Sequence, residues 1–136
     1  MKILEILTKK RSLGNRGESE ACRYLKKHGY KILKRNLVAA DAEIDIVAEC
    51  AEATVFVEVK TRTEEAQSPH EARPASAVTP EKQRKIIKAA KFFPKNPAKA
   101  MRFDIIEVIY SKKDERRPVE INHLISAFNY NSAHRR

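Results

Sequence analysis

Residues Val55–Arg62, with the sequence VFVEVKTR, give the strongest strand signal in the chain. Because side chains alternate between the two faces of a strand, the three valines would lie on one face and Glu58 and Lys60 on the other. An unpaired charge is costly to bury, so the carboxylate and the ammonium either satisfy each other and their neighbours or build a site. The structural alternative is an ion pair worth about 0–1 kcal/mol, and a lone Glu-x-Lys is most often of that kind.

A second strand, Glu43–Ala48, precedes this segment across a short polar turn, and the two together predict an antiparallel hairpin. Alternation would place Ile44 and Ile46 on one face and Asp45 on the other. In such a hairpin Asp45 and Glu58 can be neighbours on the same face. A second acid beside the first favours a site over an isolated ion pair.

Helical spacing begins at Glu18 and continues to His28, where Gly29 supplies a C-terminal stop. We interpret Gly14–Glu18 as punctuation before this helix, and the apolar segment Met1–Leu7 as one or two amphipathic turns that pack on the body or fray. Glu18 in the first turn suits the helix dipole, an effect worth up to ~1 kcal/mol. A functional role for Glu18 therefore needs support from elsewhere in the chain.

A second helix is predicted over Glu81–Phe93, because Thr79 is a good N-cap, Pro80 is favoured at the first helical position and Pro94 ends the pattern. The preceding segment, Thr63–Val78, has weak periodicity and is interpreted as a mobile loop. The polar side of the helix is strongly basic, with Lys82, Arg84, Lys85, Lys88 and Lys91.

Three further strands complete the pattern, at Tyr30–Val38, Arg102–Tyr110 and Val119–Leu124. The order of helix, three strands, helix and two strands predicts an α/β fold, with a mixed central sheet of about five strands flanked by helices. With 136 residues the chain is expected to form a single domain over residues 1–136, with residues 1–11 and 131–136 peripheral or frayed.

The net charge of +10 favours a polyanionic partner, most simply nucleic acid. The alternative is a basic protein without such a partner. The charge is unevenly spread: residues 1–36 hold eleven Lys/Arg against three Glu, residues 41–71 hold nine Asp/Glu, and residues 82–102 hold eight Lys/Arg and no acid. An acidic centre between basic arms is what a metal site within a phosphate-binding surface would need.

The two cysteines, Cys22 and Cys50, make neither a disulfide framework nor a zinc pattern, so we expect a reduced, cytoplasmic protein. Glu5 interrupts the apolar N-terminal stretch, and no later segment approaches the ~18 apolar residues of a membrane span. We therefore expect no membrane-spanning segment. The histidines show no ligand spacing and are expected to be exposed or at the edge of the core; they are His28, His70, His123 and His134.

The carboxylates of Asp45 and Glu58, with Glu18 as a third candidate, would make an oxygen-rich site for Mg²⁺ or Mn²⁺. Such an ion lowers the pKa of a bound water and neutralises charge that develops on a phosphoryl group. Lys60, two residues after Glu58, would orient or deprotonate that water or stabilise the transition state. Together with the basic flanks, these residues point to metal-dependent hydrolysis of phosphodiesters.

Five blocks of the sequence, taken in order, resemble the YraN family, a branch of the restriction-endonuclease-like PD-(D/E)XK nuclease superfamily similar to archaeal Holliday-junction resolvases. The resemblance covers about residues 12–128. The blocks are Gly14-x-x-Gly17-Glu18-x-x-Ala21, Glu43-Ile44-Asp45, Phe56–Arg62, Lys82-Gln83 and Arg102-Phe103-Asp104. No block is specific alone, but their combination in this order is. One departure is Ala42, where the family has glycine, so the turn before Glu43 is expected to differ.

The resemblance implies a restriction-endonuclease-like fold and Mg²⁺- or Mn²⁺-dependent cleavage of DNA, including branched or otherwise structured DNA. It implies metal-binding roles for Asp45, Glu58 and Glu18 and a water-activating role for Lys60. A homodimer would suit a junction substrate with two symmetric strands. The expected nucleic-acid-binding residues are Arg62, Lys82, Gln83, Arg84, Lys85 and Lys88.

The main alternative is a module that binds nucleic acid on a nuclease-like fold without cutting it, because a fold does not fix a function. The intact set of acids argues against this alternative, since a pure binder gains nothing from carboxylates that face phosphates. The sequence does not separate DNA from RNA, because phosphate contacts read neither base nor sugar.

Overall fold

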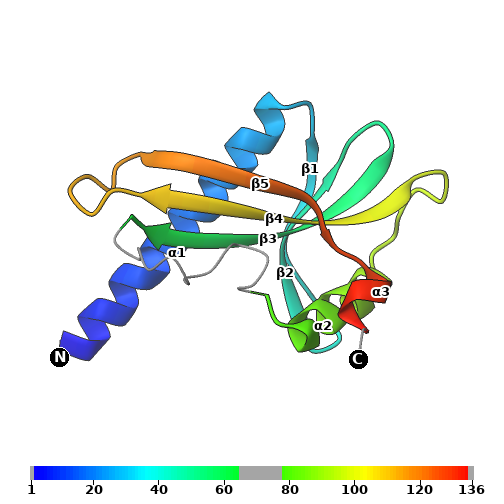
Figure 1. The fold of residues 1–136 in the computed structure, drawn as a ribbon, viewed down its shortest axis with the longest axis horizontal. Coiled ribbons are helices and arrows are strands. Elements are labelled where there is room, and N and C mark those ends of the chain that lie inside the picture. The colour runs from blue at the N-terminus through cyan, green and yellow to red at the C-terminus, as the bar shows by residue number, and fades with distance from the viewer. Residues whose placement is uncertain (1, 65–77, 135–136) are drawn as a thin grey trace.

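The computed structural model describes residues 2–64 and 78–134, with side chains from residue 12 onward. Five strands form one sheet in the order β1-β2-β3-β4-β5, in which β3 and β4 are parallel and the other neighbours antiparallel. This confirms the predicted α/β fold with a mixed sheet flanked by helices (Figure 1). The elements are α1 (Lys2–Lys27), β1 (Lys31–Ala39), β2 (Ala42–Glu49), β3 (Ala53–Thr63), α2 (Pro80–Ala90), β4 (Ala100–Tyr110), β5 (Pro118–Phe128) and α3 (Tyr130–Ala133).

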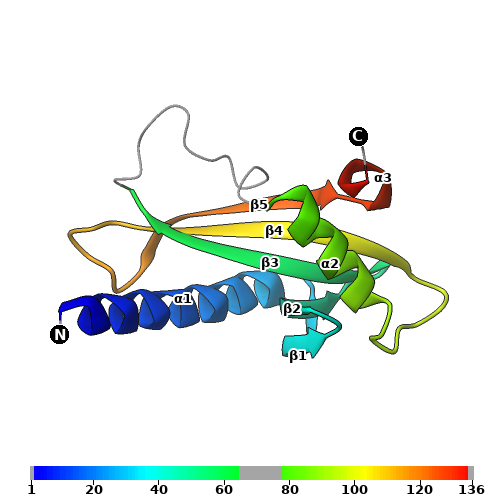
Figure 2. The ribbon, with the colours of Figure 1, turned by 90° about the horizontal axis from the view of Figure 1, so that it is seen from below.

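Each face of the sheet carries its own hydrophobic cluster. On one face α1 packs Ala21 and Leu25 against Val55 and Val57, so the valine face of β3 lies in the core as predicted. Figures 1 and 2 show α1 running along this side of the strands. Fully burying such aliphatic side chains contributes about 1.5–3 kcal/mol each, which fixes the orientation of β3.

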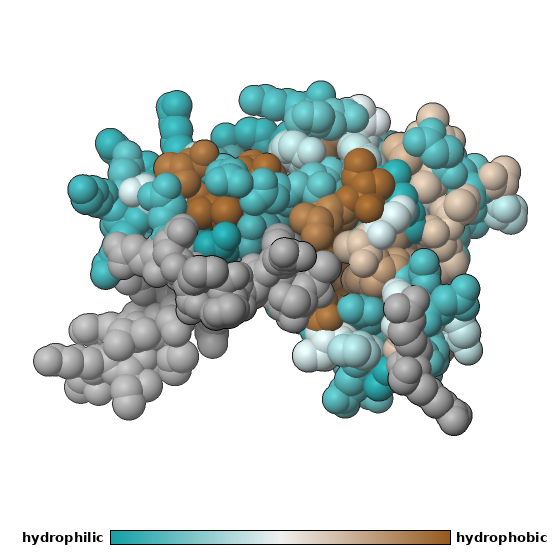
Figure 3. All heavy atoms as spheres, in the orientation of Figure 1, coloured by the Kyte–Doolittle hydropathy of each residue, from teal (hydrophilic) through white to brown (hydrophobic). Residues whose placement is uncertain are grey.

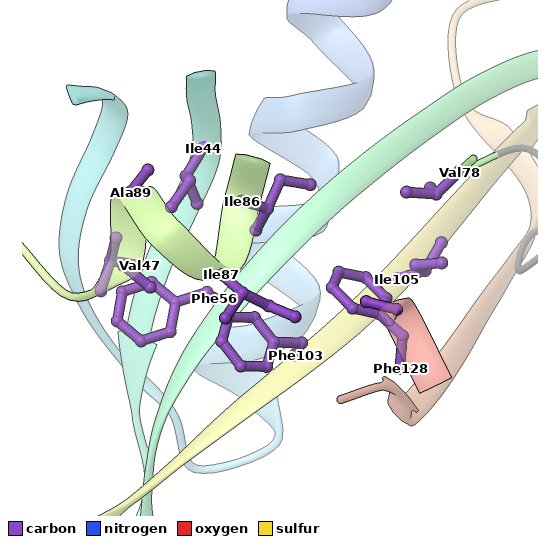
Figure 4. Close-up of a cluster of buried hydrophobic side chains, with 12 residues drawn as sticks. Ile44, Val47, Phe56, Val78, Ile86, Ile87, Ala89, Phe103, Ile105 and Phe128 are labelled. Carbon is purple, nitrogen blue, oxygen red and sulfur yellow. The ribbon is translucent and has the colours of Figure 1, made fainter. Parts of the chain in front are cut away.

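The second cluster lies between the sheet and the short helices α2 and α3. Figure 4 shows Phe56, Phe103 and Ile87, from three different elements, meeting at its centre. Phe56 and Phe103 stack with ring centroids 5.6 Å apart. Because α2 is anchored here through its apolar side, its basic side chains are left to face solvent or the pocket beside β3.

Helix α1 is longer than predicted, because it continues through Gly14 and Gly17 instead of beginning at Glu18. The interpretation of Gly14–Glu18 as punctuation was therefore wrong. A Cβ on Gly17 would overlap the Thr61 hydroxyl, so this glycine lets the helix pass close to β3. Its role is close packing, which local sequence signals cannot distinguish from a break.

Replacing Gly17 with alanine is expected to lower the free energy of unfolding by about 1–2 kcal/mol, because Thr61 is β-branched and cannot easily move aside. Gly14→Ala is the matched control, since its Cβ would meet nothing within 4 Å. In a helix that change should stabilise by up to about 1 kcal/mol. Urea denaturation of the two variants measures both effects, and equal effects would contradict the packing role.

The alternation of β2 differs from the prediction. Ile44 belongs to the cluster on the α2 side, whereas Ile46 belongs to the cluster on the α1 side. The β2–β3 ladder is regular only as far as the pair Ile46↔Val57, which confirms the hairpin but ends it there. Beyond this pair β2 leaves β3, as Figure 1 shows, so side chains before Ile46 no longer follow the alternation of the paired region.

Helix α2 begins as predicted, with the Thr79 side chain accepting a hydrogen bond of 3.2 Å from the Lys82 amide. It ends at Ala90 and does not reach Phe93, because Pro94 disfavours a helical backbone conformation at the residue before it. Of the predicted mobile loop Thr63–Val78, residues 65–77 lie outside the described residues. Val78 is not loop-like, being 1 % exposed within the α2-side cluster.

The C-terminal part is more ordered than predicted. Strand β5 runs on to Phe128, and Asn129 then caps α3 through a capping box with Ser132, where fraying was expected. The β1–β2 turn was expected to differ at Ala42, but Ala42 is an ordinary strand residue and the positive φ of 53° falls at Ala40. Among the described residues no helix is both long and apolar enough to cross a membrane.

Candidate active site

A pocket of about 1030 Å³ lies where β2 leaves β3, bounded by α1 on one side and the first turns of α2 on the other. The four residues expected to be catalytic, Glu18, Asp45, Glu58 and Lys60, all line it. They come from three elements, α1, β2 and β3, so the hairpin and the α1–β3 packing together bring them to one place. Three of the expected nucleic-acid-binding residues, Arg62, Lys82 and Lys85, also line this pocket.

The floor of the pocket is the carboxylate pair of Asp45 and Glu58. Asp45 Oδ2 accepts a hydrogen bond of 2.8 Å from the backbone N–H of Val59, so the side chain takes over where the β2–β3 ladder has ended. Glu58 is only 5 % exposed. Burial, followed by the negative charge of Glu58, raises the pKa of Asp45 to about 8, against the opposing effect of the Val59 hydrogen bond. Two carboxylates held this close need a proton or a cation between or beside them.

Two ammonium groups reach this pair. Lys60 Nζ lies 3.7 Å from Glu58 Oε2. Lys82 Nζ, from the first turn of α2, is in direct contact with the same oxygen atom. The sequence predicts the first contact from alternation, but assigns Lys82 only to phosphate binding because its approach depends on how α2 packs.

Glu18 is the outlying member of the set. Its Oε1 lies 3.9 Å from Arg35 Nη2, so its nearest cation belongs to β1. Burial raises the pKa of Glu18, with Arg35 opposing and the charges of Glu43 and Glu58 adding to the rise. Among the described residues, no group of three or more Asp, Glu, His or Cys side chains is arranged to hold a metal ion. Glu18 therefore lines the same pocket and is affected by the negative charge of Glu58, but it pairs with Arg35 and not with the Asp45–Glu58 pair.

Asn36 is a site residue that the sequence analysis did not single out. With its amide turned so that the nitrogen faces the carboxylates, it donates to Glu18 Oε1 and Glu43 Oε1, each at 3.2 Å. Its backbone has a φ of 53° inside β1, a conformation that asparagine tolerates better than most residues. Such an outlier next to a cluster of acids indicates a positioning role for Asn36.

Of the six expected nucleic-acid-binding residues, Arg62, Lys82 and Lys85 line the pocket and the other three do not. Arg62 is anchored by a 2.6 Å ion pair to buried Glu107, and Lys85 Nζ lies 3.7 Å from Glu81 on the pocket rim. Three others are absent from the pocket lining, which consists of described residues. Of these, Gln83 donates to the Val78 carbonyl at 2.9 Å, Arg84 donates to the Ala133 carbonyl at 2.8 Å, and Lys88 is exposed on α2.

A second polar cluster, on the α1 side of the sheet, centres on Asp104, which is fully buried. Asp104 accepts hydrogen bonds from Arg102 at 2.7 and 2.9 Å and from the Ser126 amide at 3.0 Å, and pairs with His123 Nε2 at 2.7 Å. Burial alone would raise the pKa of Asp104, but the hydrogen bonds from His123, Arg102 and Ser126 outweigh it and lower the pKa. The His123 side chain, on the edge strand β5, is only 5 % exposed, because a buried aspartate on β4 requires partners.

The part of the sequence that builds this pocket matches a known protein family. The sequence profile described as "Uncharacterised protein family UPF0102", the YraN family, matches residues 17–108. The chain belongs to this family. A UPF0102 protein of Geobacter metallireducens is 44 % identical over 121 residues, covering 87 % of this chain and 93 % of the relative. A UPF0102 protein of Caldicellulosiruptor saccharolyticus is 42 % identical over 122 residues, covering 88 % and 98 %.

The residues matched by the family profile include most of the pocket. Residues 17–108 contain Glu18, the Asp45–Glu58 pair, Lys60 and all of α2, so the pocket's acids and its α2 wall fall within the matched region. The relatives from Geobacter and Caldicellulosiruptor are each named as a UPF0102 protein, and the family name states no activity. Neither the family name nor the names of these relatives therefore assign a reaction to the pocket.

Proposed function

We propose that this UPF0102 protein is a Mg²⁺- or Mn²⁺-dependent endonuclease that hydrolyses phosphodiester bonds of DNA. The observation that carries the proposal is the buried carboxylate pair of Asp45 and Glu58, with Lys60 beside it, on the floor of a pocket walled by further lysine and arginine side chains. Carboxylates that face a phosphate are unfavourable for binding alone. They become useful when a cation lies between them and the phosphate.

The donor set fits a hard divalent cation. The pKa of Asp45 is raised because burial and the neighbouring Glu58 charge disfavour its ionised form, and a bound cation would relieve both effects. Mg²⁺ commonly takes only one or two protein carboxylates and completes its shell with waters and substrate phosphate. Asp45 and Glu58 would hold the ion, which when bound activates water and neutralises charge on the phosphoryl group. Glu18 would act on the site through its charge.

The protein's own side chains supply the remaining chemistry. Lys60 lies next to Glu58 and would orient the attacking water or stabilise the negative charge that develops on the pentacovalent phosphorus. Arg62 is held at the rim by Glu107, which leaves its guanidinium pre-positioned for a flanking phosphate. Lys85 and Lys88, on the exposed side of α2, would contact the backbone farther along.

A nucleic acid is the proposed substrate because the net charge of +10 attracts a polyanion, and the resemblance to the PD-(D/E)XK nucleases favours DNA over RNA. Figure 3 shows hydrophilic side chains interspersed with hydrophobic patches over the described part of one face. The resemblance to junction-resolving nucleases favours branched DNA, and a homodimer would then place two pockets on two symmetric strands.

The test is cleavage of plasmid, single-stranded and four-way-junction DNA and of single-stranded RNA, each with Mg²⁺, with Mn²⁺ and with a chelator. We expect metal-dependent cleavage that the chelator abolishes. If no DNA or RNA substrate is cut while binding is tight and salt-dependent, the protein is a binding module on a nuclease-like fold. Cleavage of RNA in place of DNA would reassign the substrate while keeping the site.

A further inference from the structure

Lys82 occupies an unusual place for a residue that binds phosphate. It lies in the first turn of α2, with its backbone fixed by the Thr79 cap, and its side chain points into the pocket. Its Nζ is in contact with Glu58 Oε2, whereas Lys60 Nζ lies 3.7 Å from that oxygen atom. The ammonium nearest to the acid pair therefore comes from α2 and not from the strand that carries Glu58.

This contact compensates the charge of the acid pair. Glu58 is 5 % exposed and shares its pocket floor with Asp45, so without a nearby cation its charge would be poorly solvated. A charge-assisted hydrogen bond from an ammonium is the strongest partner that the described side chains offer to Glu58 Oε2. Lys82 thus acts as a built-in monovalent cation for the pair.

The same oxygen atom is one that a divalent ion would need. A metal held by Asp45 and Glu58 and an ammonium in contact with Glu58 would repel each other at short range in a partly desolvated pocket. Lys82 can yield, because its side chain is 45 % exposed and has open pocket space in front of it. Lys60 is farther away and would be less disturbed.

We infer that Lys82 is a positioning residue that holds the Asp45–Glu58 pair in place of the metal and competes with the divalent ion for Glu58. This inference rests on the proposed metal-dependent function and assigns Lys82 a role other than plain phosphate binding. With a metal bound, the Lys82 ammonium would move away from Glu58 into the open space of the pocket. Lys82 thereby sets how tightly the site holds its metal before substrate arrives.

The inference is tested by titrating the full-length protein with Mn²⁺ alone, by calorimetry, in wild type and in Lys82→Met and Lys85→Met variants. Each variant removes one positive charge from the pocket wall of α2, but only Lys82 touches Glu58. We expect Lys82→Met to bind Mn²⁺ about tenfold more tightly than wild type, as loss of one charge-assisted contact predicts. Lys85→Met should change the affinity by about twofold or less, because its effect is long-range and screened.

Two results would overturn the inference while leaving the metal site standing. One is an unchanged or weaker Mn²⁺ affinity in Lys82→Met, and the other is an equal gain in Lys85→Met, which would show a general charge effect. Circular dichroism confirms that each variant is folded, which is expected because both side chains are partly exposed to solvent. If wild type and all variants bind no Mn²⁺, the proposed metal-dependent function itself fails, and the role of Lys82 fails with it.

Discussion

Replacing Asp45 with asparagine should make the metal-free protein more stable, by about 2–3 kcal/mol at pH 8. An ionised Asp45 carboxylate is unfavourable in the folded protein, because it is buried away from water and lies next to the negative charge of Glu58. These two effects raise the pKa of Asp45 to about 8. One pKa unit corresponds to about 1.4 kcal/mol, and the expected gain is smaller than the full shift implies because water still reaches the pocket. Asparagine keeps an acceptor for the 2.8 Å hydrogen bond from the Val59 amide, so the β3 backbone stays satisfied.

The pH dependence of this effect has a definite sign. The folded-state pKa of Asp45 lies above its ordinary value of 3.8, so between about pH 4 and pH 8 the folded protein binds more protons at this group than the unfolded chain. The contribution of Asp45 to stability is therefore fully present below pH 4 and is lost as the pH rises through 8. The advantage of Asp45→Asn should be small at pH 4 and grow steadily to pH 8.

Chemical denaturation at several pH values measures this difference. Asp41→Asn is the matched control, because it removes an exposed carboxylate from the lining of the same pocket and should change stability by less than about 0.5 kcal/mol. Mn²⁺ should stabilise wild type and have little effect on Asp45→Asn, since only the native carboxylate pair binds the ion. If the free energies of unfolding of wild type and Asp45→Asn differ by the same amount at every pH from 4 to 8, ionisation of Asp45 does not destabilise the folded protein.

A site that lowers stability in this way was partly visible in the sequence. Alternation along β3 correctly separates the valines from Glu58 and Lys60, because a strand period of two is a local property. The β2–β3 hairpin follows from a short polar turn, which is also local. Together these local features suffice to bring Asp45 near Glu58, even though the exact alternation of β2 fails where the ladder ends.

The features of the site that sequence reasoning missed depend on contacts between segments that are distant in the sequence. The continuation of α1 through Gly17 depends on Thr61, far away in the sequence, and the contact of Lys82 with Glu58 depends on how α2 docks. The positive φ of Asn36 is explained only by the hydrogen bonds of its side chain to Glu18 and Glu43, which the sequence does not show. Hydrophobic periodicity and secondary-structure propensity do not report such contacts. Polar residues at the ends of helices and strands are therefore assigned to solvent or to phosphate binding.

Replacing Lys60 with methionine should lower kcat for metal-dependent cleavage by about 10²–10⁴-fold while changing KM little. The side chain is similar in length and shape, so the change removes the ammonium that lies 3.7 Å from Glu58 Oε2 and keeps most of the packing. An interaction made chiefly in the transition state affects kcat, whereas one made equally with bound substrate affects KM. Single-turnover cleavage of a junction or linear duplex, at saturating metal, separates the two quantities.

Lys85→Met is the matched comparison, because Lys85 lines the same pocket but lies next to Glu81 rather than to the acid pair. It should raise KM several-fold and leave kcat near the wild-type value, as expected for a contact to backbone phosphate. If Lys60→Met behaves like Lys85→Met, Lys60 is a phosphate contact and the water-activating role is wrong.

Lys60→Arg then distinguishes the two ways in which Lys60 could act. Arginine keeps a positive charge next to Glu58 but does not give up its proton in a protein, so it can stabilise a charged transition state and cannot serve as a base. Substantial residual cleavage would assign Lys60 to electrostatic stabilisation of the phosphorane. Loss as deep as that of Lys60→Met, in a folded variant that still binds Mn²⁺, would assign it to proton transfer from the attacking water. The Lys60→Arg and Lys60→Met variants are compared in the same pocket with the same metal and substrate, so a difference between their cleavage rates reports the chemistry of the side chain alone.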